Sequence, residues 1–265
     1  MMNQLIIGQY VPGESLIHRL DPRSKLIAAI IYIFIVFLAN NFETYACLAV
    51  FTIASVVLSR IPIHYLYRGL RPVLWVVFFS FLLQAFVTKR GDLLFHWEWI
   101  HLYEGGVIQG IYIALRILFL IVVSTLLTLT TPPIDITDGM ETLLSPFKRI
   151  RMPVHEFALM ISISLRFIPT LMEETEKIMK AQQARGTEFS SGPIVDRIKA
   201  FISLLIPLFV SAFKRAEDLA LAMEARGYRG GDGRTKLRLL AWHSGDTLLM
   251  ILLAILAAVL LWFRT

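Results

Sequence analysis

The residues of this chain best suited to bind a partner are two copies of one tripeptide. Ala184-Arg185-Gly186 ends one long helical pattern, and Ala225-Arg226-Gly227 ends a second one. A planar guanidinium can donate two parallel hydrogen bonds to one carboxylate. An Arg just before a helix-ending Gly therefore presents a fork suited to an acidic groove. The same residues also suit a plain C-terminal helix cap, because a cation complements the helix dipole and Gly adopts the left-handed turn.

The repetition of the tripeptide favours a binding role over capping alone. Each Arg follows a Glu by nine residues, Glu176 in the first copy and Glu217 in the second. The segments before the tripeptides also align, as SLRFIP…ARG and SLLIP…ARG, in a weak internal repeat. The sequence therefore predicts two similar binding tips on two similar helices.

No other pattern in the sequence points to catalysis or to a cofactor. There is no GxxxxGK[ST] loop for ATP phosphates, no HExxH and no GxSxG. Cys47 is the single cysteine, and the six histidines are scattered without metal-ligand spacing. We therefore expect no catalytic residues, no metal site and no cofactor.

The composition indicates a membrane protein. Hydrophobic residues make up 56% of the chain, and the mean hydropathy of +0.65 is too high for an ordinary soluble domain. A membrane-spanning helix needs roughly 20 apolar residues. Five stretches are predicted to span the membrane: 25–41, 44–59, 72–87, 107–130 and 247–263. The stretch 72–87 could begin as early as Tyr65. None of them contains Asp or Glu, which proton-coupled carriers usually need.

The net charge of +6 follows membrane topology and does not indicate a nucleic-acid partner. Basic residues gather before the first stretch and in the loop 60–71, so the positive-inside rule puts the N-terminus in the cytoplasm and the C-terminus outside. The segment 131–246 is then cytoplasmic, and it holds sixteen of the twenty-six basic residues. The expected domains are a membrane domain, 1–130, a cytoplasmic domain, 131–246, and a last transmembrane helix, 247–265.

Two long helices are predicted in the cytoplasmic segment. One runs from about Pro153 to Gly186, and the second follows SSGP, 190–193, and ends at Gly227. Ile168-Pro169 and Ile206-Pro207 should kink or break them. Each is almost continuously apolar before its Pro, which is more apolar surface than a soluble domain exposes. We therefore interpret them as coupling helices that lie against the membrane, each other or a partner protein.

Two further features lie within or beside the membrane stretches. Arg116 falls inside the fourth stretch, where an arginine is costly and often functional. Carbonyls of a neighbouring helix, Gln84 or a partner could instead satisfy it. The sequence DPRSK, 21–25, is interpreted as a turn before a helix start whose basic residues anchor at lipid headgroups.

The chain resembles the transmembrane T component of energy-coupling factor (ECF) transporters, a family that includes the cobalt-transport Q proteins. The resemblance spans essentially the whole chain. It rests on LDPRSKL (20–26), MPVHEFALMISISLRFIP (152–169) and the two ARG motifs at 184–186 and 225–227.

The resemblance implies an all-α integral membrane protein of about five transmembrane helices plus long cytoplasmic coupling helices. Such a protein is a non-catalytic scaffold in a bacterial or archaeal cell membrane. It joins two cytosolic ABC-type ATPase subunits, which bind the ATP, to a small substrate-binding membrane subunit for vitamin or transition-metal uptake. Arg185 and Arg226, with the Ala and Gly beside each, would dock on one ATPase apiece. The apolar stretches before the motifs would face the substrate-binding subunit.

Three other functions are alternatives. A self-contained secondary transporter or channel would use Arg116, but the stretches carry no acidic residue. A conventional ABC permease subunit would also couple to ATPases, with its own translocation path. A membrane enzyme would need chemistry from Asp135, Asp138, Glu173 or Glu174, whose spacing fits no catalytic arrangement.

Overall fold

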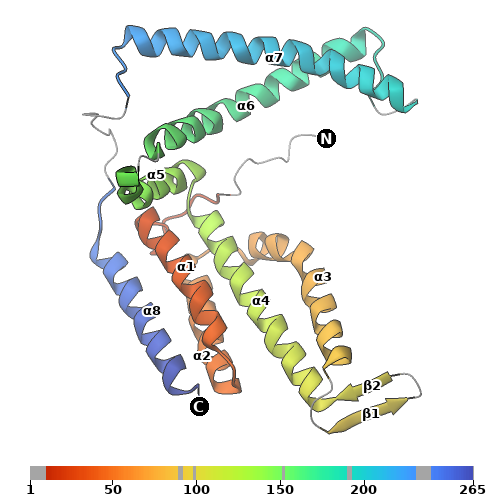
Figure 1. The fold of residues 1–265 in the computed structure, drawn as a ribbon, viewed down its shortest axis with the longest axis vertical. Helices are drawn as coiled ribbons and strands as arrows, with labels where there is room; N and C mark the ends of the chain where they lie inside the picture. The colour runs from red at the N-terminus through yellow and green to blue at the C-terminus, as the bar shows by residue number, and fades with distance from the viewer. Residues whose placement is uncertain are drawn as a thin grey trace. The chain divides into compact units, whose positions relative to one another are not determined.

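The computed structural model describes residues 10–88, 92–97, 100–150, 153–189, 193–230 and 240–264. The chain forms two compact units, Met1–Leu143 with Leu239–Thr265, and Leu144–Arg238. Helices make up nearly all of the regular structure in the described residues (Figure 1). The predicted class, an all-α integral membrane protein, is therefore confirmed.

The first unit is a bundle of packed helices. α1 lies against α4 and α8, α2 lies against α4 and α8, and α3 runs along α4 (Figure 1). Their side chains meet in an apolar core that includes Tyr32, Val36, Leu48, Leu253 and Leu260. The helix bounds are α1 (Pro22–Leu38), α2 (Phe42–Ser59), α3 (Ile63–Val87), α4 (Glu104–Thr130) and α8 (Ser244–Trp262).

A short hairpin joins α3 to α4, where the sequence predicted only a loop. β1 (Leu93–Trp97) pairs antiparallel with β2 (Ile100–Tyr103). Just after the hairpin, α4 approaches α3 very closely. A Cβ placed on Gly106 would lie 2.7 Å from the carbonyl oxygen of Thr88 and 3.0 Å from that of Ala85. Only glycine allows this approach, which is common between membrane helices.

Five helices in the described residues are long and apolar enough to cross a membrane: α2, α3, α4, α6 and α8. Four of them match predicted stretches, and α3 begins at Ile63, even earlier than Tyr65. The remaining predicted stretch, 25–41, is helical only to Leu38, because Ala39 is extended. The corresponding helix, α1, has just 17 residues. α6 (Val154–Ala184) meets the same criteria, although the sequence assigned it to the coupling helices.

α5 (Pro133–Leu144) belongs almost entirely to the first unit, whereas the predicted cytoplasmic domain began at residue 131. Close packing against α1 explains this. A Cβ on Gly139 would lie 3.3 Å from Cβ of Pro22 and 3.4 Å from the backbone nitrogen of Arg23. The short 3-10 helix η1 (Ser145–Ile150) follows α5 and starts the second unit.

A buried carboxylate ties the start of α1 to the start of α8. Asp246 is 0% exposed. It accepts hydrogen bonds from the backbone N–H of Asp21 at 2.9 Å, from the hydroxyl of Ser24, and from the backbone N–H of His243 at 2.8 Å. One acidic side chain therefore satisfies donors at two helix N-termini, where the helix dipoles also favour negative charge.

Lys25 satisfies hydrogen-bond acceptors at the C-terminal end of α4. Its Nζ donates to the carbonyl oxygens of Thr130 at 3.1 Å and His18 at 3.3 Å, and to Oγ1 of Thr131 at 3.2 Å. The ammonium thus uses all three of its donors inside the protein, and Lys25 is only 6% exposed. The prediction that Lys25 anchors at lipid headgroups is therefore wrong.

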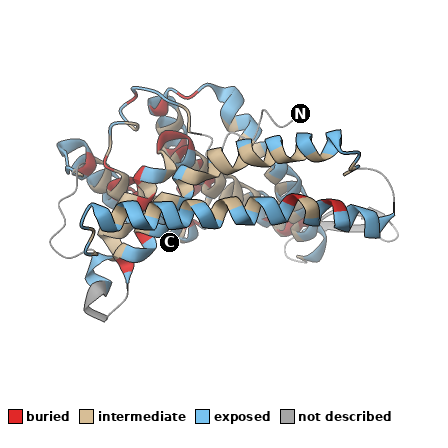
Figure 2. Ribbon diagram, turned by 90° about the horizontal axis from the view of Figure 1, so that it is seen from above, coloured by how far each residue is buried: buried red, intermediate tan, exposed pale blue. Residues whose placement is uncertain are grey.

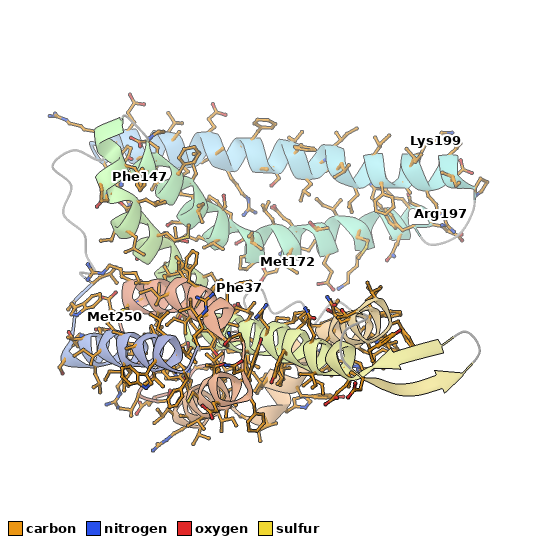
Figure 3. The ribbon with its side chains drawn as sticks, turned by 60° about the horizontal axis from the view of Figure 1, so that its bottom comes forward. Phe37, Phe147, Met172, Arg197, Lys199 and Met250 are labelled. Atoms are coloured by element: carbon orange, nitrogen blue, oxygen red, sulfur yellow. The ribbon has the colours of Figure 1, made fainter. Side chains whose placement is uncertain are left out.

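Arg116 is held within the bundle, although its Nε is buried without a hydrogen-bond partner among the described residues. Its Nη2 donates to the carbonyl oxygen of Ala39 at 3.0 Å, at the C-terminal end of α1, and the guanidinium lies 5.3 Å from the ring centre of Phe37, labelled in Figure 3. The backbone carbonyl of a neighbouring helix, one of the alternatives left open above, is therefore its partner. Gln84 instead accepts a hydrogen bond from Thr88.

In the second unit the described residues form η1 and two long helices, α6 (Val154–Ala184) and α7 (Ile194–Ala225). Both run without interruption through their internal prolines, Pro169 and Pro207, so of the two expected outcomes, a kink or a break, the break does not occur. Pro193 lies at the N-cap of α7, one position before the first turn where it was expected. The capping serines of SSGP lie outside the described residues.

The first prediction concerns the contact between α3 and α4. Gly106→Ala should destabilise the protein by about 1–3 kcal/mol, because the new methyl group meets backbone oxygens that cannot rotate away. The melting temperature in detergent measures this. Gly245→Ala is the matched control, since its Cβ would approach only the flexible end of Leu20 at 3.3 Å. Equal melting temperatures for the two variants would contradict the prediction.

The second prediction concerns acid stability. Burial raises the pKa of Asp21, but hydrogen bonds from the side chain and backbone of Arg23 lower it more, so the pKa lies below the usual 3.8. The stability from ionised Asp21 is therefore fully present above about pH 4 and is lost as pH falls through the lowered pKa.

In Asp21→Asn the acid-induced drop in melting temperature should become smaller, while the amide still caps α1. Glu14→Gln changes a carboxylate whose side chain is 92% exposed and serves as the control. If Asp21→Asn and Glu14→Gln gave the same pH profile, Asp21 would have no such role.

Candidate functional site

The two predicted tips end α6 and α7 with nearly the same backbone geometry. α6 ends at Ala184 and α7 at Ala225. Arg185 has φ −87° and ψ 5°, and Arg226 has φ −86° and ψ 6°. The following glycines are left-handed, with φ of +86° at Gly186 and +71° at Gly227. The sequence repeat therefore corresponds to a structural repeat.

Backbone hydrogen bonds close both ends in the same way. In α6, the N–H of Gly186 donates to the carbonyl of Gln183 at 2.9 Å, and that of Thr187 donates to Gln182 at 3.0 Å. In α7, Gly227 donates to Glu224 at 2.8 Å and Tyr228 to Met223 at 3.0 Å. Both are Schellman caps, in which the main chain alone satisfies the last carbonyls. Neither cap needs the arginine side chain.

Both arginines are exposed, as are the alanine and glycine beside each. Within the described part of the chain, no side-chain hydrogen bond, ion pair or ring contact involves Arg185 or Arg226. A guanidinium held at a helix end without an internal partner keeps its five donors for another molecule. The structure therefore leaves both forks free to bind.

The glutamates nine residues upstream do not bind these arginines. Glu176 pairs with Lys180 on the next turn of α6 at 2.9 Å, and Glu217 is exposed on α7. The repeated Glu that strengthened the sequence argument is thus a feature of the helix surfaces and not a part of either tip.

α6 and α7 run in opposite directions, as the colours in Figure 1 show. Glu174 of α6 accepts hydrogen bonds from Ser211 and Arg215 of α7. Arg185 follows Glu174 by eleven residues, and Arg226 follows Arg215 by the same number. Each tip is therefore about 16 Å along its helix from this contact, so the tips lie roughly 33 Å apart along the pair.

Sequence reasoning missed the contact between these helices. Glu174 was considered only as a catalytic acid in a rival function, and Ser211 and Arg215 were not singled out. A signal was present, because Glu174 and Arg215 are separated by the same forty-one residues as Arg185 and Arg226. Equivalent positions of two antiparallel repeats meet at the centre of the pair.

A polar cavity of about 400 Å³ lies beside the first tip. The cavity is lined by Gly186, Thr187, Glu188, Asp196, Lys199, Ala200 and Ser203, of which Lys199 is labelled in Figure 3.

α7 exposes a long apolar face, and most of this helix is exposed in Figure 2. Its exposed apolar side chains recur every three or four residues, at Ile194, Ile198, Phe201, Leu205, Phe209 and Phe213.

The described residues contain no group of three or more His, Cys, Asp or Glu side chains that could hold a metal ion. The acidic residues considered for an enzyme are occupied in other ways or dispersed. Glu174 is paired with Arg215, and Asp135 is a buried residue of α5 in the other unit. What the arrangement offers is two exposed cations at fixed positions, which suits binding.

Comparisons with known proteins cover both tips. The model of the cobalt transport protein family, CbiQ, matches residues 13–237. A Bacillus subtilis protein named energy-coupling factor transporter transmembrane protein EcfT is 60% identical over 264 residues, covering 100% of both chains. Proteins of the same name from Listeria innocua and Streptococcus thermophilus are 54% and 48% identical, each over 100% of both chains.

The third prediction tests the caps. Gly186→Ala and Gly227→Ala should each cost about 1 kcal/mol, because L-alanine is strained at positive φ. The amide of Thr187 or Tyr228, which closes the cap, should then exchange its hydrogen about fivefold faster. Hydrogen exchange measured by mass spectrometry reports this. Asn tolerates the left-handed turn, so Gly→Asn at either position should have a smaller effect. Equal exchange in the Ala and Asn variants would refute the strain argument.

Proposed function

Since the chain belongs to the cobalt transport protein family, we propose that it is the transmembrane scaffold subunit of an energy-coupling factor importer. In this role it couples ATP hydrolysis by two cytosolic ABC-type ATPase subunits to movement of a small substrate-binding membrane subunit. The observation that carries the proposal is the pair of exposed, unpartnered guanidiniums on matching helix caps.

Two similar tips suit two similar partners. Each Arg can form a bidentate contact with a carboxylate in a groove of one ATPase. The roughly 33 Å between the tips along the helices leaves room for one subunit at each. When ATP binding or hydrolysis moves the ATPases, α6 and α7 move with them, because each helix is bound to an ATPase through the Arg at its end. The ATP is bound by the partners, and this chain supplies no catalytic group.

The exposed apolar face of α7 supports contact with a membrane partner. Its side chains, together with Phe157 and Met160 of α6, form the surface that the substrate-binding subunit would cover. Movement of the coupling helices would then reorient that subunit and release a vitamin or a transition-metal ion, such as cobalt or nickel, into the cell. Burial of this face against protein or lipid removes it from water.

The proposed orientation places the N-terminus and the two coupling helices in the cytoplasm. The distribution of Lys and Arg supports it, since the short loops on that side are the basic ones. The tips then face the compartment that holds ATP. The alternative of a self-contained transporter loses its best candidate group, because Arg116 is held by the carbonyl of Ala39 and the ring of Phe37.

The fourth prediction tests docking. Arg185→Ala or Arg226→Ala should weaken ATPase binding roughly 10- to 150-fold, because a hydrogen bond to a charged group contributes about 1.5–3 kcal/mol. The double variant should lose more than either single one. Co-purification of the ATPases with the chain in mild detergent, and substrate uptake by vesicles, measure the two effects.

Arg166→Ala and Lys214→Ala are the matched controls, since both remove an exposed cation from the same helices without touching a tip. Undiminished ATPase recovery with the double variant would reject the docking role. Transport by the purified chain alone in liposomes would favour a secondary transporter instead.

A further inference from the structure

We propose that Glu174, Ser211 and Arg215 form a polar clamp that sets the angle between α6 and α7 and so positions both arginine tips. They are positioning residues, since none of them lies at a tip. The proposal rests on the proposed function for what the tips bind. The clamp itself rests on contacts within the helix pair.

The clamp is densely bonded. The hydroxyl of Ser211 lies 3.0 Å from both carboxylate oxygens of Glu174 and shares its one proton between them, and Nη2 of Arg215 donates to Oε1 of the same carboxylate. Ser211 and Arg215 are one helical turn apart, so they present their donors from one face of α7. The side chains of Arg215 and Glu174 are 30% and 24% exposed. A pair so shielded is screened less by salt than a surface pair.

The clamp is equidistant from the tips. Glu174 is eleven residues before Arg185, and Arg215 is eleven residues before Arg226. Two antiparallel helices related by an approximate two-fold axis bring equivalent residues together only where the axis crosses the pair. The clamp occupies that point, so it acts as a fulcrum with two arms of about 16 Å each. A change of angle there moves both tips by equal amounts.

α6 and α7 pack closely on only one side of the clamp, so packing alone does not fix the angle between them. Toward Arg185 the helices touch, with Ala200 and Leu204 buried and a hydrogen bond from Gln182 to the carbonyl of Ser203 at 3.4 Å. On the other side they leave an apolar groove of about 350 Å³. Ile163, Phe167 and Leu171 of α6 face Ala212, Ala216 and Ala220 of α7 across it.

The groove makes the ion pair necessary. Both rows repeat every four residues, so bulky side chains oppose small ones along matching ridges. Nothing polar in the described lining of the groove except Arg215 holds the rows apart, and apolar surface gains stability by closing on itself. Without the clamp, α6 and α7 should therefore close over the groove and displace the tips.

The test measures the helix angle and transport separately. The angle is reported by spin labels attached to Arg166→Cys in α6 and Asp218→Cys in α7, in a Cys47→Ser background. Both positions are exposed, and they lie on either side of the groove. Glu174→Gln and Arg215→Gln should each shorten the label-to-label distance. The charge swap Glu174→Arg with Arg215→Glu should restore it, since the ion pair re-forms with its polarity reversed.

Uptake by the complete transporter should fall about fivefold in each single variant and recover in the swap. The variants should still recover the ATPases, because the tips are intact. Glu173→Gln and Lys214→Gln are the matched controls, since they remove an exposed neighbouring charge of the same sign from the same helix. They should leave both distance and uptake unchanged.

An unchanged label distance in both single variants would overturn the clamp. So would a swap that restores neither distance nor uptake. The outcome is separable from the proposed function. If the unmutated chain recovered no ATPase, the docking role would fail, while the label distances, which require no partner, would still decide the clamp.

Discussion

The ends of its helices impose the strictest physical demand on this protein. Each end leaves backbone donors or acceptors unpaired, and a bilayer offers no water to satisfy them. The bundle meets the demand with buried charges. Asp246 serves the starts of α1 and α8, and Lys25 serves the end of α4. α6 and α7 meet it with main-chain bonds around a glycine. The charges of Asp246 and Lys25 are therefore bonded within the bundle, whereas the arginines at the two tips remain free for a partner.

The same difference explains why similar residue types have opposite roles in one chain. Arg116 and Lys25 lie inside the bundle, and each is bonded to carbonyl oxygens at a helix C-terminus. Arg185 and Arg226 also lie at helix C-termini, but their carbonyls are already satisfied by the glycine turn. A cation inside a membrane-spanning helix, such as that of Arg116, is costly to place. The cations that cost least to expose are the ones that the fold presents to other molecules.

Local patterns in the sequence were sufficient for most helices and for the tips. Hydropathy located α2, α3, α4 and α8, and Arg-Gly at the ends of two apolar runs located both caps. What failed depended on tertiary context. Proline was expected to kink or break α6 and α7, yet both helices continue through it without a break. Lys25 was expected at the headgroups, yet the unsatisfied carbonyls of α4 hold it inside. The pairing of Glu174 with Arg215 required knowing that the two repeats meet antiparallel.

One property of the caps concerns handedness. A Cβ built on Gly186 or Gly227 would meet no heavy atom within 4 Å. Size is therefore not what excludes other residues there, and the backbone torsion alone does so. A mirror-image amino acid prefers the torsion that these glycines adopt. Chemical synthesis or ligation could thus place D-alanine at either turn and stiffen it while leaving the neighbouring arginine where it is. The two turns select for chirality at positions that are sterically open.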